Sequence, residues 1–281
     1  MKIIEYESIV RAVESVCLSA AFKLPDDVRR AINKALDEEI SDTGKLILKQ
    51  CLENAGIAEK EQVPICQDTG TAVFFVEIGN EVYIEGGIIN DAISEGTERG
   101  YAKGYLRKSM VSDPVFNRKN TGDNTPPVIH LEIKKGKKLK ITLVPKGGGS
   151  ENMSALAMLK PFEGEKGIID FVVSTVKKAG ANPCPPTIVG VGIGGTFEFA
   201  ACLAKKALLR PAGIPNKNKR YAMLEEKILH MLNTSGIGPQ GFGGKTTALG
   251  VNIEFFPCHI ASLPVAVNLN CHAARHSVVE L

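Results

Sequence analysis

Apolar residues recur at helical spacing through the first sixty residues of the chain. Three helices are predicted there: one around Ile9, Val13 and Val16, one opened by Pro25-Asp26-Asp27, and one over Thr43–Asn54 after Ser41-Asp42. Acidic residues in a first helical turn favour a helix start, because they face the positive end of the helix dipole. Cys17 and Cys51 fall on the apolar faces of these helices, so we predict that both are core residues.

Beyond residue 60, short apolar runs that are typical of strands alternate with helical patterns. The predicted strands are Thr71–Ile78, Val128–Ile133, Leu139–Val144, Thr187–Val191, Leu249–Phe256 and Ala261–Val267. The predicted helices are Gly86–Gly104, Met153–Leu159, Glu165–Ala179, Thr196–Leu209 and Arg220–Asn233. A lysine-rich turn separates the second and third strands, which we expect to form an antiparallel pair.

These elements predict an α+β fold, with a helical region at 1–60 and a strand-rich core at 61–281 that carries functional loops. We expect one domain over residues 1–281, because this length can bury a single large core, with one domain plus a smaller companion as the alternative. Apolar residues make up 44% and charged residues 23% of the chain, and the net charge is +3, which is too small to favour a nucleic-acid partner. Glu5, Glu7 and Glu14 interrupt any signal-peptide pattern, and Glu198 breaks the longest apolar stretch, so we expect a cytoplasmic protein without a membrane segment.

The seven cysteines fall into two environments. Cys17, Cys51 and Cys202 lie in apolar helical patterns and are expected to behave as small hydrophobic residues. Those on loops that adjoin strands are Cys66, Cys184 and Cys271, whereas Cys258 is ambiguous. An odd number of irregularly spaced cysteines does not indicate a disulfide framework, so the loop thiols are available for metal binding or chemistry.

Three loop thiolates are consistent with two kinds of metal centre. Structural zinc favours four ligands and paired Cys-x-x-Cys spacing, which is missing here, although a catalytic zinc with three protein ligands is possible. Soft thiolates without close pairing suit an iron–sulfur cluster better. If three thiolates hold a four-iron cluster, one iron has no protein ligand and can act as a Lewis acid toward a substrate oxygen.

Glycine-rich segments offer a nucleotide-binding alternative. Gly190, Gly192 and Gly195 match Gly-x-Gly-x-x-Gly after a strand, but no second strand ending in an acidic residue follows, so close strand–helix packing explains them more simply. Gly236–Thr247 is similar to a phosphate loop, yet Pro239 stands where that loop requires its first glycine. In Lys146–Asn152, consecutive glycines between two elements can instead direct backbone N–H groups at an anion.

Several motifs taken together are more specific than any one of them. They are Ile65-Cys66-Gln67-Asp68-Thr69-Gly70, Lys146-Gly147-Gly148-Gly149-Ser150-Glu151-Asn152, Asn182-Pro183-Cys184-Pro185-Pro186, Gly192–Glu198, Gly238–Thr247 and Asn270-Cys271-His272-Ala273-Ala274-Arg275. In this order, over nearly the whole chain, the sequence resembles the class I iron–sulfur fumarate hydratases, which include L-tartrate dehydratase. The match covers the N-terminal half of the single-chain enzymes, so the chain resembles the alpha subunit of the two-subunit form.

The resemblance implies a site and a reaction. Cys66, Cys184 and Cys271 would hold a [4Fe–4S] cluster with one open iron. Four positions would contact a dicarboxylate: Gln67, Asp68, Arg107 and the amide of Gly149. His259 would be an active-site histidine that forms a proton-transferring pair with Asp68.

The implied reaction is reversible hydration of fumarate to L-malate, with L-tartrate and then mesaconate as other substrates. The resemblance also implies a separate beta subunit that is needed for turnover, and a dimer of alpha–beta pairs. An NAD- or nucleotide-binding protein and a zinc hydrolase are the alternatives from other classes.

Overall fold

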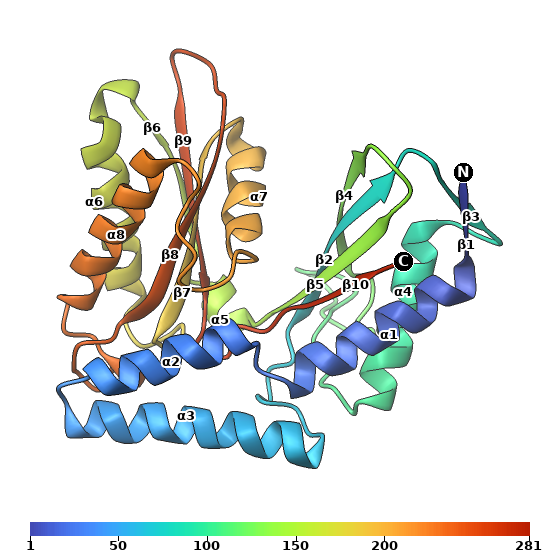
Figure 1. Cartoon of the computed structure of the whole chain (residues 1–281), viewed down its shortest axis with the longest axis horizontal. Helices are drawn as coiled ribbons and strands as arrows, with labels where there is room; N and C mark the ends of the chain where they lie inside the picture. Colours follow the sequence, from blue (N-terminus) through green and yellow to red (C-terminus); the bar gives the residue numbers. More distant parts are fainter. The chain divides into compact units, whose positions relative to one another are not determined.

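The computed structural model describes all residues, 1–281, and folds into two compact units. Both are discontinuous in sequence. The first unit comprises Met1–Leu24, Ala55–Gly148 and Arg275–Leu281, and the second comprises Pro25–Asn54 and Gly149–Ala274. Each unit contains its own helices and sheet, which confirms the predicted α+β fold (Figure 1). The single domain stays a prediction. No helix is both long enough and apolar enough to cross a bilayer.

The first unit is built on a four-stranded sheet in the order β10-β5-β2-β4. These strands are β10 (Ser277–Glu280), β5 (Leu139–Lys146), β2 (Thr71–Gly79) and β4 (Val128–Lys134). Its other elements are β1 (Lys2–Glu5), paired in parallel with β3 (Val82–Glu85), and two helices, α1 (Tyr6–Phe22) and α4 (Ile89–Lys103). Helix α1 packs on α4 and on β5. Together with the sheet it buries an apolar cluster that includes Val13, Phe74 and Ile141.

The second unit has a four-stranded sheet in the order β6-β9-β7-β8. These strands are β6 (Ala155–Leu159), β9 (Leu263–Asn270), β7 (Thr187–Gly194) and β8 (Ala248–Phe256). Three helices accompany it: α6 (Gly164–Ala179), α7 (Phe197–Ala207) and α8 (Lys219–Asn233). Helices α6 and α8 lie on one side of the sheet and α7 on the other (Figure 1). Helix α2 (Asp26–Glu38) contacts β8, α3 (Asp42–Glu61) follows it, and the short α5 (Gly148–Glu151) precedes β6.

Most helices and strands form where the sequence predicts them, because their apolar spacing matches the face that they bury. Helix α1 buries Ile9, Val13 and Val16, and α3 starts at the predicted cap, where Ser41 Oγ accepts a hydrogen bond from Gly44 N over 3.2 Å. Cys17 is buried as predicted. Cys51 was predicted to be a core residue as well. This prediction is wrong, because Cys51 is only half-buried.

The predicted antiparallel pair of Val128–Ile133 and Leu139–Val144 is wrong. Strand β2 lies between β4 and β5, running parallel to β4 and antiparallel to β5. The lysine-rich turn therefore passes over the end of β2, where Gly79 N donates to Lys138 O over 2.8 Å. A Cβ atom at Gly79 would lie 2.2 Å from Gly136 O, so only glycine fits under this turn. Strand order depends on long-range burial, which the local hairpin signal does not contain.

The predicted helix at Met153–Leu159 is also wrong, because Ala155–Leu159 forms strand β6. Alanine, leucine and methionine have high intrinsic helix propensity, which explains the prediction. In the structure this segment pairs antiparallel with β9, from Ala155 opposite Val267 to Leu159 opposite Leu263. Tertiary pairing at the sheet edge thus overrides local preference.

The glycines of β7 allow α7 to approach the sheet closely. A Cβ atom at Gly190 would lie 2.1 Å from Ala204 O, and one at Gly192 would lie 2.0 Å from Ala200 O. Both contacts involve helix backbone, which cannot move aside without displacing α7. The glycine motif is therefore explained by strand–helix packing, as the sequence suggested.

We expect Gly192→Ala to lower the free energy of unfolding of the second unit by about 1–3 kcal/mol, because the added methyl overpacks the β7–α7 contact. Chemical denaturation followed by circular dichroism measures this change. Gly250→Ala on the neighbouring strand β8 is the matched control, since no atom lies within 4 Å of its Cβ position. Equal stability of the two variants would contradict the packing explanation.

Candidate functional site

The predicted residues Cys66, Gln67 and Asp68 lie in the first unit on one loop, residues 65–70, which is called the Asp68 loop below. Both oxygens of the Asp68 carboxylate accept backbone hydrogen bonds: Oδ1 from Gly70 N over 3.1 Å and Oδ2 from Gly148 N over 2.8 Å. The glycine-rich segment after β5 therefore directs an amide at this carboxylate. Because each carboxylate oxygen has two lone pairs, Asp68 keeps acceptor capacity for a ligand.

Buried side chains hold the backbone of the Asp68 loop. The hydroxyl of Tyr101 lies 3.1 Å from Thr69 O and 3.0 Å from Gly70 O, and Asn124 Nδ2 donates to Gly70 O over 3.2 Å. Burial raises the pKa of Tyr101, so its phenol stays a neutral donor at physiological pH. Arg275 Nη2 donates to Asp68 O over 2.8 Å, and the side chain of Arg275 is only 3% exposed. The loop is therefore a rigid platform rather than a flexible segment.

Arg107 is brought to the same loop. Thr69 Oγ1 donates to the carbonyl oxygen of Arg107 over 2.9 Å, while Arg107 as a residue is exposed to solvent. The first unit thus places a guanidinium-bearing residue and the Asp68 carboxylate on adjoining segments. An exposed arginine beside fixed backbone amides is suited to binding a carboxylate, because its guanidinium forms two parallel hydrogen bonds.

Cys184 and Cys271 lie on adjoining turns of the second unit. Cys184 precedes β7 and Cys271 follows β9, and these antiparallel strands pair Ile188 with Asn270, so both cysteines lie at the same end of the sheet. The backbone N–H of His272 donates to Cys184 O over 3.3 Å. Cys184 is exposed and has a left-handed backbone with φ +54°, a conformation that is sparsely populated outside glycine and recurs at functional sites.

A third thiol of the second unit, Cys51 in α3, lies within electrostatic range of this pair. Burial, together with the smaller effect of negative charge on Cys271 and Cys184, raises the pKa of Cys51 to about 11. The sequence did not indicate this proximity, because Cys51 is far away along the chain and its helical spacing is typical of a core residue.

The soft donor chemistry of Cys184 and Cys271 fits an iron–sulfur cluster or zinc. Cys66, the third predicted ligand, belongs to the first unit, where its Sγ lies 3.4 Å from Gln67 Oε1. No three His, Cys, Asp or Glu side chains of the structure lie together as a group that could hold a metal ion. The two thiols on adjoining turns therefore fit as part of a ligand set, and the complete set stays a prediction.

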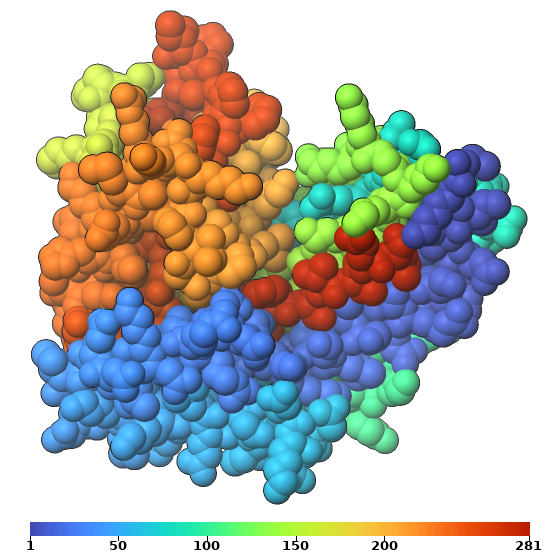
Figure 2. Space-filling model, in the orientation of Figure 1, coloured from blue at the N-terminus to red at the C-terminus, as the bar shows by residue number.

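His259 lies at the opposite end of the same sheet. It belongs to the exposed turn between β8 and β9, where its Nδ1 accepts from Ala261 N over 3.1 Å (the red projection at the top of Figure 2). The eight residues of β9 separate this turn from Cys271 by about 25 Å at about 3.3 Å per residue. The second unit therefore does not bring its own His259 to Cys184 and Cys271. Gly149, by contrast, lies near the Cys184 turn, since its Cβ position is 3.4 Å from Asn182 O.

The phosphate-loop-like segment holds an anion that belongs to the chain itself. Glu39, at the end of α2, is 3% exposed, and its carboxylate accepts from four backbone N–H groups: Ile40, Ser41, Lys245 and Thr246. Burial alone would raise the pKa of Glu39, but these four donors together lower it below its usual value. A Cβ atom at Gly244 would lie 2.6 Å from Glu39 Oε1, which explains the glycine there. These amides are therefore not available to a nucleotide phosphate.

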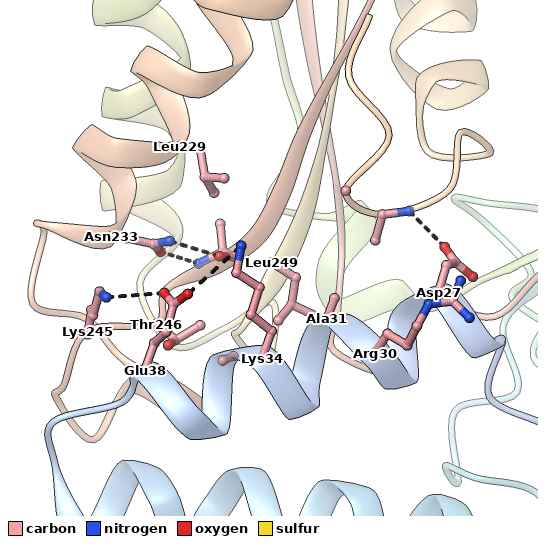
Figure 3. A pocket seen from close by; sticks show the side chains of 14 residues that line it. Asp27, Arg30, Ala31, Lys34, Glu38, Leu229, Asn233, Lys245, Thr246 and Leu249 are labelled. Atoms are coloured by element: carbon pink, nitrogen blue, oxygen red, sulfur yellow. Dashed lines mark hydrogen bonds and ion pairs between the residues drawn. The ribbon is translucent and has the colours of Figure 1, made fainter.

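A cavity of about 390 Å³ lies beside this carboxylate in the second unit (Figure 3). Helix α2 lines it with charged residues that include Asp27, Arg30 and Lys34, and Asn233 and Lys245 add polar side chains from other segments. None of the residues predicted for the site lines this cavity. This cavity is thus separate from the turns that carry Cys184 and Cys271.

The fold and the site define an α+β protein that carries cysteine thiols and a backbone-bound carboxylate on loops at strand ends. A family model described as "Fumarate hydratase (Fumerase)" matches residues 10–280. A Methanocaldococcus jannaschii protein named provisionally as an L(+)-tartrate dehydratase subunit alpha is 43% identical over 266 residues, which cover 93% of either chain. The Escherichia coli K12 L(+)-tartrate dehydratase subunit alpha is 36% identical over 262 residues, which cover 92% of this chain and 85% of that protein. The chain therefore belongs to the fumarate hydratase (Fumerase) family.

We expect Glu39→Gln to destabilise the second unit by about 1–3 kcal/mol at pH 7, because the new Nε2 donor cannot accept from a backbone N–H. The pKa of Glu39 is lowered by folding, so its contribution is present above the unfolded carboxyl pKa of about 4.3 and is lost as the pH falls through the folded value. Denaturation from pH 7 to pH 3 should show the two proteins converging in acid. A difference that is constant with pH would contradict this assignment.

Proposed function

We propose that this chain is the alpha subunit of an iron–sulfur hydro-lyase that interconverts fumarate and L-malate. The observation that carries the proposal is the pair of adjoining turns that present Cys184 and Cys271 at one end of the sheet. Family membership supports the same reading, because the matching family is described as fumarate hydratase. Neither glycine motif supports the nucleotide-binding alternative, since one packs a helix and the other binds Glu39.

In this proposal Cys184 and Cys271, together with Cys66, hold a [4Fe–4S] cluster as thiolates. When bound, such a cluster supplies a Lewis-acidic iron that no protein ligand occupies. The left-handed turn at Cys184 exposes its residue to solvent, so the thiol is accessible to an incoming cluster. The three isolated thiols lack the paired spacing of structural zinc, which supports iron over zinc.

The Asp68 loop would bind the dicarboxylate. Arg107 would hold one carboxylate through its guanidinium, Gln67 would donate from its amide, and the N–H of Gly149 would stabilise negative charge that develops next to a carboxylate. Asp68 would hold a proton at Oδ1 or Oδ2 during transfer, because both oxygens are oriented by backbone donors and keep a free lone pair. His259 would form a proton-transferring pair with Asp68, and it lies at the opposite end of its own sheet from Cys184 and Cys271.

L-tartrate is the second candidate substrate, and the names of the relatives favour it, since proteins at 36–43% identity are named as L(+)-tartrate dehydratase alpha subunits. The same names support a partner, because an alpha subunit implies a beta subunit. We propose that a separate beta chain completes the substrate site and that the enzyme is a dimer of alpha–beta pairs. Turnover then requires both chains.

The decisive experiment is a dehydratase assay under argon, with the cluster reconstituted and with fumarate, L-malate, L-tartrate and mesaconate as substrates. We expect turnover only when the beta chain is added.

Asp68→Asn should lower kcat by about 100-fold or more, since general acid–base groups contribute about that factor. Asp113→Asn is the control, because Asp113 likewise accepts backbone N–H groups in the first unit but lies in another loop. Turnover by the alpha chain alone would refute the need for a partner.

Iron and sulfide content test the assignment of the thiols. We expect Cys184→Ala to abolish or strongly reduce both after anaerobic reconstitution, whereas His259→Asn should leave both unchanged, because His259 lies at the far end of the sheet. Metal analysis and absorption spectra of the two variants provide the measurement. Equal loss of iron in both variants would contradict the placement of His259.

A further inference from the structure

Gln240 contacts the Cys184 turn through two hydrogen bonds to one atom. Its backbone N–H donates to the carbonyl oxygen of Pro185 over 2.7 Å, and its side-chain Nε2 donates to the same oxygen over 2.8 Å. A carbonyl oxygen only accepts hydrogen bonds, so this contact fixes the orientation of the Gln240 amide. The second hydrogen on Nε2 is then available to another acceptor.

The second neighbour of this amide is His272, whose Nδ1 lies 3.0 Å from Gln240 Nε2. His272 follows Cys271 directly, and its backbone N–H donates to Cys184 O over 3.3 Å. Its Nδ1 accepts from Gln240 Nε2 when that ring nitrogen carries no proton. Gln240 therefore joins the residue after Cys184 to the residue after Cys271. The Gln240 side chain thus connects the glycine-rich loop to both the Cys184 turn and the Cys271 turn.

The loop that carries Gln240 is fixed from two sides. Gln240 has φ +51°, a left-handed conformation that costs free energy and persists only where the surroundings impose it. A Cβ atom at Gly241 would lie 2.4 Å from Ala181 Cβ, so the loop packs directly against the start of the Cys184 turn. At its other end, the loop is anchored by the amides of Lys245 and Thr246 on Glu39.

We propose that Gln240 is a positioning residue for the cluster, which it serves by holding the Cys184 and Cys271 turns at a fixed separation. The inference rests on the proposed function, because it concerns the thiols assigned there as cluster ligands. Residues that orient ligands through hydrogen bonds commonly affect metal affinity by about 10–100-fold. Without the Gln240 amide, the two turns lose a shared hydrogen-bond partner and are held together by the His272 N–Cys184 O bond and the pairing of β7 with β9.

Gln240→Asn tests this directly. Asparagine tolerates the left-handed backbone but is one methylene too short to reach Pro185 O. Gln62→Asn is the matched control, since Gln62 has φ +53° and its Nε2 also donates to a carbonyl, that of Glu59, on an exposed helix end. We expect Gln240→Asn to lose iron to a chelator about 10-fold faster than wild type and to alter the electron paramagnetic resonance spectrum of the oxidised cluster, with Gln62→Asn matching wild type in both.

Gln240→Glu should lose iron at least as fast, because a carboxylate cannot donate to Pro185 O. Wild-type rates of iron loss in both Gln240 variants would overturn the inference while leaving the proposed function intact. If the wild-type chain takes up no iron and sulfide, the proposed function fails instead. Hydrogen exchange at the His272 amide of cluster-free protein tests the link between the two turns by itself. Faster exchange in Gln240→Asn supports the link, and exchange equal to wild type refutes it together with the inference.

Discussion

Backbone N–H groups that converge on a carboxylate organise both units of this protein. In the second unit, four of them close on the buried Glu39 and fix one end of the glycine-rich loop. In the first unit, two of them hold the carboxylate of Asp68. Loop backbone has no ladder of its own, so a carboxylate that satisfies several donors at once orders a segment that helix and strand propensity cannot.

The two carboxylates serve different ends because their burial differs. Glu39 is almost entirely removed from solvent, so its charge acts only on the protein and stabilises the loop that presents Gln240. Asp68 is partly exposed and keeps lone pairs for a ligand. A carboxylate bound by backbone amides thus stabilises the scaffold at Glu39, and at Asp68 it forms part of the substrate site that we propose.

The antiparallel direction of β7 and β9 determines which of the predicted functional residues lie close together within the second unit. Because β7 and β9 are antiparallel, the residues before β7 and after β9 meet at one end, which brings Cys184 and Cys271 to adjoining turns. His259 comes before β9, so it lies at the opposite end of this sheet from Cys271. A family motif that is written in sequence order therefore includes residues that the sheet brings together and residues that it separates.

The order of residues along the chain determined the helices with strong apolar periodicity, the strand after the Asp68 loop and the three loop cysteines, because these depend on local spacing and on flanking proline and glycine. The sequence did not determine that β2 enters between β4 and β5, or that 155–159 is a strand, because pairing partners far along the chain decide both. The burial of Glu39 has no local signal, since two of its four donors, Lys245 and Thr246, come from a segment about two hundred residues further along the chain. Only the tertiary structure shows Gln240 between the two thiol turns, because hydrogen bonds between loops depend on how the whole sheet positions their ends.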